Sequence, residues 1–270
     1  MKVKDKVIVV TGGGNGMGRE IVLNLLKKGA KVAAVDINEP ALEQTQTLAG
    51  DLAGNLSIHV LNITNKAEVE AFPEIVIQKH GTVDGLINNA GIIQPFEKVN
   101  IIGYDIIERV MNIDFYGTLF MVKAFLPYLL KQPEGHIANI SSMGGFLPVP
   151  GQSIYGAAKA GVKIMTEGLS KELSNTNVHT TVIFPGAIAT DIKVNSGAEE
   201  AGENDDKAKN SLIKPLLPSK AAEIIISAIE KNKQRVFVGN DSKVMDALYR
   251  INPMFAASLI AKQMKSHVPD

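Results

Sequence analysis

Cysteine is absent from the 270 residues of this chain. Its absence excludes disulfide bonds, thiolate nucleophiles and cysteine metal ligands, and the 5 histidines are too scattered along the sequence to predict a metal cluster. An excess of either charge is absent too, because 28 basic residues balance 28 acidic ones. We therefore expect no nucleic-acid partner, since a balanced chain creates no net field that attracts phosphates.

Long apolar runs are also missing. No stretch approaches the ~18 residues that cross a membrane, and the N-terminal residues do not match a signal peptide. With 45% hydrophobic residues, a chain of 270 residues can bury the core of one α/β domain. We therefore expect a cytoplasmic protein with a single domain over residues 1–270.

The first residues have the order strand, glycine-rich turn, helix, strand. A β-branched run, Val7–Val10, precedes the segment TGGGNGMG at Thr11–Gly18, and the helix that follows ends at Gly29 before a second strand at 31–35. Glycines let backbone N–H groups approach a pyrophosphate at the positive end of the helix dipole. The order of these elements predicts a dinucleotide-binding turn.

Asp36 follows the second predicted strand. A carboxylate there, about twenty residues past the glycines, suits both hydroxyls of an adenosine ribose and repels a 2′-phosphate. Neither Asn15 nor Ile37 supplies a cation for such a phosphate. NAD is therefore predicted over NADP; the alternative is that Asp36 caps the helix after Pro40.

Strand-like and helix-like segments alternate along the rest of the chain. Short β-branched runs are followed by segments with apolar residues at helical spacing. Such alternation indicates an α/β fold with a doubly wound parallel sheet, whose ligands bind at the carboxyl ends of the strands. The predicted strands are 7–10, 31–35, 57–61, 83–88, 136–141, 178–184 and 236–238, and predicted helices include 19–28, 66–80, 104–131 and 220–231.

Tyr155 and Lys159 lie four residues apart in a segment with helical periodicity, so their side chains share one face of a helix. A neighbouring ammonium lowers the pKa of a phenol from its usual ~10, which suits Tyr155 to acid/base chemistry. Ser142 follows a predicted strand, where its hydroxyl can bind a substrate oxygen. The alternative is an ordinary exposed helix face, because such short motifs arise by chance.

Further motifs occur in order along the chain: Thr11-Gly12-x-x-x-Gly16-x-Gly18, Asn88-Asn89-Ala90-Gly91, Asn112, Ser142, Tyr155-x-x-x-Lys159 and Pro185-Gly186 with Thr190. Over about residues 6 to 190 the chain thereby resembles the short-chain dehydrogenase/reductase family, which has a Rossmann-like fold. The resemblance implies hydride transfer between a nicotinamide cofactor and a secondary alcohol or carbonyl. It also implies a homotetramer or homodimer.

The resemblance assigns roles to individual residues. Tyr155 is the acid/base, Lys159 lowers its pKa and holds the nicotinamide ribose, Ser142 binds the substrate oxygen and Asn112 supports a proton-relay water. The family usually has aspartate at position 62, but an asparagine oxygen also accepts a hydrogen bond from the adenine amine. The implied cofactor contacts are Gly12, Asn15, Gly16, Met17, Gly18, Asp36, Ile37, Asn62, Ile63, Asn89, Ala90, Gly91, Tyr155, Lys159, Pro185, Gly186, Ile188 and Thr190.

The loop between Ser142 and Tyr155 is largely apolar. It predicts an uncharged, largely apolar secondary alcohol or ketone as the substrate, in a pocket formed by Gln94, Met143, Phe146, Leu147 and Gln152. One alternative is a 3-oxoacyl-thioester (acyl carrier protein) reductase, which an acidic stretch in 191–217 disfavours. A non-catalytic, dinucleotide-sensing or interaction protein on the same fold is the other.

Two segments lie beyond these motifs. The polar, irregular segment at about 191–217 occupies the position of the family's substrate lid, and the alternative is a solvated, disordered insertion. The segment at about 241–270 has an amphipathic pattern broken at Pro253. We expect it to dock on its own or a neighbouring subunit; the alternative is that it lies on a membrane surface.

Overall fold

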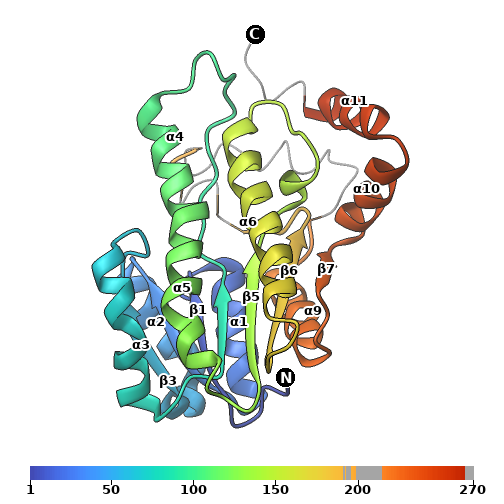
Figure 1. Cartoon of the computed structure of the whole chain (residues 1–270). Helices are drawn as coiled ribbons and strands as arrows, with labels where there is room; N and C mark the ends of the chain where they lie inside the picture. Colours follow the sequence, from blue (N-terminus) through green and yellow to red (C-terminus); the bar gives the residue numbers. More distant parts are fainter. Residues whose placement is uncertain (191, 193–195, 199–214, 265–270) are drawn as a thin grey trace.

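The computed structural model describes residues 1–190, 192, 196–198 and 215–264. Its centre is a seven-stranded sheet with the order β3-β2-β1-β4-β5-β6-β7, and every pair of neighbouring strands is parallel (Figure 1). The predicted doubly wound parallel sheet is therefore confirmed. The strands are β1 (Val7–Thr11), β2 (Lys31–Asp36), β3 (Leu56–Val60), β4 (Gly85–Asn88), β5 (Gly135–Ile140), β6 (Val178–Pro185) and β7 (Arg235–Val238).

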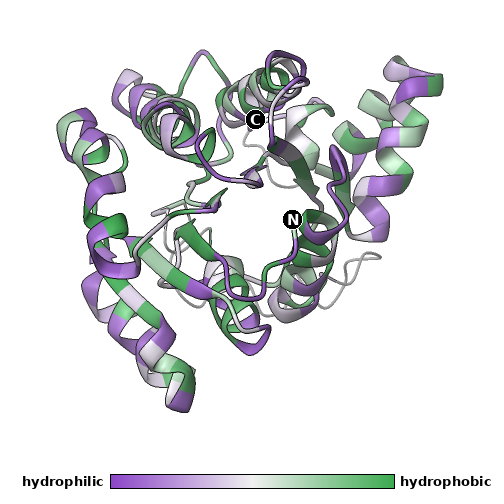
Figure 2. Cartoon of the chain, turned by 60° about the horizontal axis from the view of Figure 1, so that its bottom comes forward, coloured by the Kyte–Doolittle hydropathy of each residue, from purple (hydrophilic) through white to green (hydrophobic). Residues whose placement is uncertain are grey.

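Helices cover both faces of the sheet. On one face, α1 (Gly16–Lys27), α2 (Glu39–Ala49) and α9 (Pro218–Glu230) pack through one apolar cluster. On the other, α3 (Lys66–His80), α5 (Thr118–Leu129) and α6 (Ser153–Glu172) pack through a second. Figure 2 shows hydrophobic residues along the strands and mixed polarity on the surrounding helices. Strands buried on both faces explain the continuous β-branched runs in the sequence.

The strand order reverses between β1 and β4. Successive strands lead outward from β1 to β3, and the chain then returns to place β4 on the other side of β1. In doubly wound sheets, the carboxyl ends of the strands on either side of this reversal border the ligand crevice. The fold therefore directs the loops after β1 and β4 to a common place.

The predicted helix at 104–131 differs from the observed one. The structure has α4 (Tyr104–Val110), a π-helical segment η2 (Met111–Gly117) and then α5 (Thr118–Leu129). The 3.6-residue period of the sequence does not reveal this local widening, which in proteins is rare and frequently located at functional sites. The segment matters below because it carries both Asn112 and Asp114.

The C-terminal segment forms two helices, α10 (Asn240–Ile251) and α11 (Pro253–Met264). The predicted break at Pro253 is confirmed. Met245, Ala256 and Ile260 pack with Leu147 of the loop before α6, so the segment docks on its own chain. None of the helices within the described residues combines the length and apolar character needed to cross a bilayer. Most of the predicted lid at 191–217, with its acidic stretch, lies outside the described residues.

Candidate active site

The loops after β1 and β4 are tied together by hydrogen bonds. The hydroxyl of Thr11 accepts from the backbone N–H groups of Asn89 and Ala90, each at 3.0 Å. The side-chain amide of Asn89 in turn donates to the carbonyl of Thr11 at 3.1 Å. The glycine-rich turn and the Asn88–Gly91 loop therefore form one continuous wall at the carboxyl edge of the sheet.

The glycine-rich turn has the geometry of a phosphate-binding turn. Gly12 and Gly16 adopt φ values of +67° and +50°. A Cβ at Gly18 would lie 1.9 Å from the carbonyl oxygen of Gly12, so only glycine fits there. Asn15 is the N-cap residue of α1, yet its side chain makes no capping hydrogen bond, which leaves the first N–H groups of the helix available to an anion. The residues present thus fit a dinucleotide pyrophosphate.

Asp36 ends β2 beside this turn. One carboxylate oxygen accepts from Gly14 N at 3.0 Å, and the other accepts from Asn38 N at 3.1 Å. Asn38 is the residue that caps α2, through its bond from Ala41 N at 3.1 Å. The alternative role of Asp36 as the helix cap is therefore wrong, and its carboxylate stands fixed at the edge of the glycine turn.

The remaining predicted cofactor residues border the same edge in different ways. The side-chain oxygen of Asn62 already accepts from the backbone and the hydroxyl of Thr64 at 3.0 and 2.8 Å, while Ile63 is buried. Thr190 lies across the site, since its Cγ2 would be 3.2 Å from a Cβ at Gly16. The strand-like segment at Ile188 forms a bridge with Leu216.

Ser142, Tyr155 and Lys159 come together between β5 and α6. The Lys159 ammonium lies 5.8 Å from the centre of the Tyr155 ring, and Ser142 caps a short 3₁₀ helix, η3 (Met143–Gly145), by accepting from Gly144 N at 3.1 Å. Ser141 donates to the backbone carbonyl of Lys159 at 2.8 Å, which joins the end of β5 to α6. The prediction that Tyr155 and Lys159 lie together on one helix is confirmed, since both belong to α6.

The pKa of Tyr155 shifts in the opposite direction to our expectation. Burial raises the pKa of the phenol, the negative charge of Asp114 raises it further, and a hydrogen bond with Ser142 partly opposes both effects. The ammonium of Lys159, which we expected to lower this pKa, also faces a carboxylate, with Nζ 3.8 Å from Asp114 Oδ2. In the free protein, Tyr155 therefore holds its proton at neutral pH.

Asp114 was not singled out by sequence reasoning, which chose Asn112 on the same π-helical segment. Asn112 is exposed, whereas Asp114 is fully buried. The signal in the sequence was a carboxylate between the apolar residues Ile113 and Phe115. An acidic residue in such a position is buried with a partner far more often than alone. Of the two residues, Asp114 is therefore the one that lies beside Lys159.

Two residues predicted for the substrate pocket are hydrogen-bonded to the backbone. Gln94 Oε1 accepts from Ile154 N at 3.0 Å and from Tyr155 N at 2.8 Å, so it satisfies the first turn of α6. Gln152 Nε2 donates to Gln94 O at 2.8 Å. These bonds fix the start of the helix that carries Tyr155, and a contact of either residue with substrate stays a prediction.

The other three predicted pocket residues follow Ser142. Leu147 is buried, with 1% of its surface exposed, and packs against the C-terminal helices. Met143 and Phe146 are partly buried and border the same cluster. Met143 and Phe146 therefore keep part of their apolar surface exposed, whereas Gln94 and Gln152 are hydrogen-bonded to the backbone.

A further residue that sequence reasoning missed is Asp241, in the first turn of α10. Its carboxylate accepts from Ala187 N at 2.7 Å, and the next residue, Ser242, donates to Phe184 O at 2.8 Å. These contacts hold the Pro185–Gly186 loop after β6. The C-terminal helices thus support both the loop after Ser142 and the loop predicted to face the nicotinamide.

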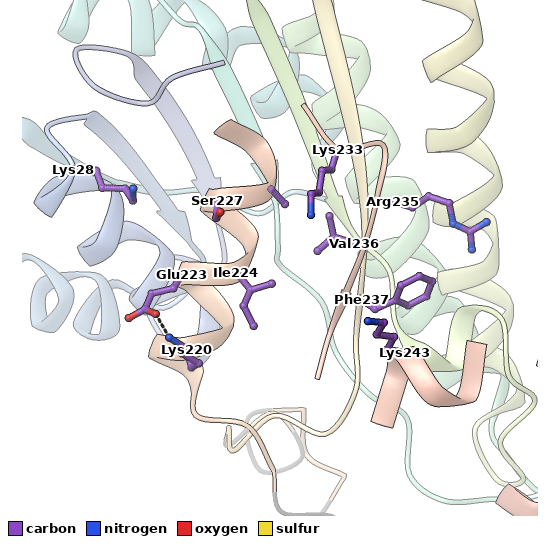
Figure 3. A pocket seen from close by; sticks show the side chains of 11 residues that line it. Lys28, Lys220, Glu223, Ile224, Ser227, Lys233, Arg235, Val236, Phe237 and Lys243 are labelled. Atoms are coloured by element: carbon purple, nitrogen blue, oxygen red, sulfur yellow. Dashed lines mark hydrogen bonds and ion pairs between the residues drawn. The ribbon is translucent and has the colours of Figure 1, made fainter. Parts of the chain in front are cut away.

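A surface pocket of about 620 Å³ lies apart from these residues, between α9 and β7 (Figure 3). Its lining includes several cations, but most have a carboxylate partner: Lys28 with Glu230, Lys220 with Glu223, and Arg235 with Glu167 and Asp246. The pocket therefore offers little uncompensated charge. In the part of the chain that the structure describes, no three His, Asp or Glu side chains are grouped as a metal site.

Comparison with known proteins places this geometry in context. A family model described as short chain dehydrogenase matches residues 6–201. The oxidoreductase SadH of Mycobacterium tuberculosis is 35% identical over 269 residues, 98% of this chain and 97% of that protein. The 3-oxoacyl-[acyl-carrier-protein] reductase FabG of Thermotoga maritima is 36% identical over 190 residues, 70% of this chain and 77% of that protein. A short-chain dehydrogenase/reductase from Burkholderia phymatum, crystallised with NAD, superposes with a TM-score of 0.79 at 25% identity, covering 88% of this chain and 90% of that one.

Proposed function

Because this chain belongs to the short-chain dehydrogenase/reductase family of NAD(P)-binding oxidoreductases, we propose that it transfers a hydride between NAD(H) and an uncharged, largely apolar secondary alcohol or ketone. The observation that carries the proposal is the grouping of Ser142, Tyr155 and Lys159 beside a turn that fits a dinucleotide. That grouping supplies an acid/base within reach of a substrate oxygen. It also distinguishes an enzyme from a non-catalytic dinucleotide sensor.

The cofactor would be held along the carboxyl edge of the sheet. The backbone N–H groups of Asn15–Gly18 would bind the pyrophosphate, Asp36 the adenosine ribose, and the loops at 89–91 and 185–190 the nicotinamide half. NAD, when bound, supplies the hydride acceptor for oxidation, and its reduced form supplies the donor for reduction. The fixed carboxylate of Asp36 supports NAD over NADP.

Tyr155 would move the proton that accompanies the hydride. In reduction, its phenol donates a proton to the carbonyl oxygen; in oxidation, its phenolate takes the proton of the alcohol. The raised pKa of the free phenol keeps the donor form ready for reduction. Ser142 would hold the substrate oxygen beside the phenol, since its hydroxyl is near enough to the phenol to lower the pKa of Tyr155. The exposed side chain of Asn112 gives no support to a proton-relay role.

The class of substrate is supported by the loop after Ser142. Met143 and Phe146 offer apolar surface there, and no acidic or basic side chain occurs in the segment 143–152. Such a lining favours an apolar substrate oriented by one or two hydrogen bonds. The similarity to FabG supports a second candidate, reduction of a 3-oxoacyl thioester.

Steady-state kinetics on a matched panel tests the proposal. Secondary alcohols with NAD, ketones with NADH, and 3-oxoacyl thioesters with each reduced cofactor would be compared by absorbance of the reduced nicotinamide. We expect simple alcohols or ketones to give the highest kcat/KM. A clear preference for a carrier-bound thioester or a charged sugar acid would replace the proposed substrate class.

The variant Tyr155→Phe tests the acid/base role. It should lower turnover by at least about two orders of magnitude, the usual contribution of general acid/base catalysis, while dinucleotide binding stays nearly unchanged. Tyr128→Phe is the matched control, because it removes a hydroxyl that donates to the exposed carboxylate of Glu74 at 3.2 Å. Retained turnover in Tyr155→Phe would remove Tyr155 from this role.

The quaternary structure is also a proposal. A homotetramer or homodimer would pair copies through the helical layer that contains η2 and α6, where Tyr116 and Ile164 keep 43% and 61% of their surface exposed. Exposed large apolar side chains of this kind favour association. Light scattering after size exclusion would give the mass directly, and a monomer at working concentration would contradict the proposal.

A further inference from the structure

The two C-terminal helices, α10 and α11, each have an inner and an outer face. On the inner face, Met245, Ala256 and Ile260 are buried and pack with Leu147. Figure 1 shows the two helices at the edge of the molecule, beyond β7. Because the inner face already holds the helices on the fold, apolar residues on the outer face are not needed for that packing.

The outer face is apolar where the two helices meet. Ile251, Met254 and Phe255 keep 83%, 76% and 56% of their surface exposed, and Pro253 between them is exposed too. Val244, which is also exposed, lies about two turns before Ile251 and therefore on the same side of α10. Single exposed apolar residues are common, but a contiguous group marks a contact with a partner or a membrane.

The charge on this outer face is positive. Lys243, Arg250 and Lys262 are exposed, and no acidic residue occurs in the segment 247–264. Lys243 lies near the start of α10 and Lys262 in the last turn of α11, so the two lysines flank the apolar corner. An apolar area bordered by cations is typical of helices that lie on a membrane surface.

The acidic residues of α10 are engaged by the protein itself. Asp241 accepts from Ala187 N at 2.7 Å. Asp246 lies 3.4 Å from Arg235 and accepts from Arg250 Nε at 2.7 Å, so two arginines share one carboxylate. These carboxylates therefore do not cancel the positive charge of the outer face.

This charge pattern distinguishes between the candidate occupants of the face. In a symmetric dimer the same patch would face itself, so its cations would approach one another. Anionic lipids instead present phosphates to the cations, and their acyl chains receive the apolar side chains. Charge complementarity therefore favours a bilayer with anionic lipids over a second copy of this chain.

We propose that the outer face of α10 and α11 binds the surface of a bilayer that contains anionic lipids. Ile251, Met254 and Phe255 enter the headgroup region, and Lys243 and Lys262 pair with lipid phosphates. The proposal goes beyond the reaction proposed above and does not depend on it, because these residues lie outside the candidate active site.

The first test measures sedimentation of the full chain with lipid vesicles. Vesicles of phosphatidylcholine alone are compared with an equimolar mixture of phosphatidylcholine and phosphatidylglycerol, at low and at high salt. We expect binding to the anionic mixture that falls as the salt concentration rises, since salt screens the attraction between exposed charges. No binding to the anionic mixture, or equal binding to both kinds of vesicle, would overturn the proposal.

The apolar contribution is tested by the double variant Ile251→Gln/Phe255→Gln. We expect its partition coefficient for the anionic vesicles to be at least about tenfold lower than that of wild type, because two large apolar side chains no longer enter the headgroup region. The matched control is Leu48→Gln/Ile75→Gln, which replaces exposed apolar residues of α2 and α3 and should bind like wild type. Equal binding of the two double variants would overturn the proposal.

The charge contribution is tested at one exposed lysine. Lys262→Gln should weaken binding by about fivefold, the effect of one cation near an anionic surface, while Lys27→Gln, in the last turn of α1, should leave it unchanged. Lys262→Gln also keeps the proposal testable if the double variant does not fold, and an unchanged partition coefficient in Lys262→Gln would overturn it.

Light scattering without lipid tests the second copy as the occupant. We expect wild type and Ile251→Gln/Phe255→Gln to have the same mass. A lower mass for the double variant would assign the outer face to a contact between copies of the chain and overturn the proposal.

Discussion

Replacing Asp36 tests the cofactor preference at one side chain. Both of its carboxylate oxygens accept a backbone N–H, from Gly14 at 3.0 Å and from Asn38 at 3.1 Å. Each oxygen has a further lone pair, so two remain for the hydroxyls of an adenosine ribose. Arg19, in the first turn of α1, donates to Gly14 O at 3.0 Å and to Gln44 Oε1 at 2.7 Å and is therefore engaged away from a 2′-phosphate.

The size of the effect follows from these bonds. A hydrogen bond to a charged group contributes about 1.5 to 3 kcal/mol, against about 1 kcal/mol for a neutral one. Asp36→Asn should therefore weaken NAD binding by about 1 kcal/mol or more, which is close to tenfold in Kd. Repulsion between a carboxylate and a phosphate 4 Å away is about 1 to 4 kcal/mol per pair of unit charges, so NADP binding should tighten by at least about tenfold.

The assay is a fluorescence or calorimetric titration of both dinucleotides into wild type, Asp36→Asn and a control. Glu39→Gln removes one negative charge from the first turn of α2, where the side chain is exposed. We expect the ratio of the two Kd values to change by about a hundredfold in Asp36→Asn and to stay the same in Glu39→Gln. Equal ratios in all three proteins, or equal effects of the two substitutions, would refute the assigned role of Asp36.

Two further predictions concern other buried contacts. Burial lowers the pKa of His136 to about 3, and its Nε2–H donates to Thr181 Oγ1 at 2.8 Å because that hydroxyl already donates to Lys233 O. A lowered pKa means that stability is complete above about pH 6.5 and is lost as the pH falls toward 3. Chemical denaturation should therefore give a free energy of unfolding about 2 kcal/mol lower at pH 5 than at pH 7. In His136→Gln this difference should be smaller, and an equal difference in wild type and variant would contradict the prediction. Asp241→Ala removes the acceptor for Ala187 N and should raise KM for NAD several-fold with a smaller change in kcat, and an unchanged KM would contradict the support role of α10.

Much of the fold was predictable because its signals are local. The predicted helix at 66–80 agrees with α3 (Lys66–His80), and the strands differ from the predicted ones by a residue or two at their ends. β-branched runs buried on both faces and glycine turns are properties of neighbouring residues. The positions of Tyr155 and Lys159 on one helix follow from the same kind of local periodicity.

The environment of the site was less predictable because it depends on distant contacts. The backbone of Tyr155 donates to Gln94, 61 residues earlier, so a residue predicted for the substrate pocket also holds the start of the helix. Asp114 reaches Lys159 where η2 packs against α6. The pKa of Tyr155 rises instead of falling, first through burial and further through Asp114, and the spacing of Tyr155 and Lys159 contains no information about either.

The residues that hold Tyr155 and Lys159 in place are different from the apolar residues expected to contact the substrate. Gln94 accepts from Tyr155 N, and Ser141 donates to Lys159 O, so the loops after β4 and β5 fix Tyr155 and Lys159 through the backbone of their helix. None of these bonds uses the apolar side chains of the segment 143–146. Substitutions in that segment should therefore alter which alcohol or ketone is accepted, while the pH dependence that we expect from Tyr155 and Lys159 is retained.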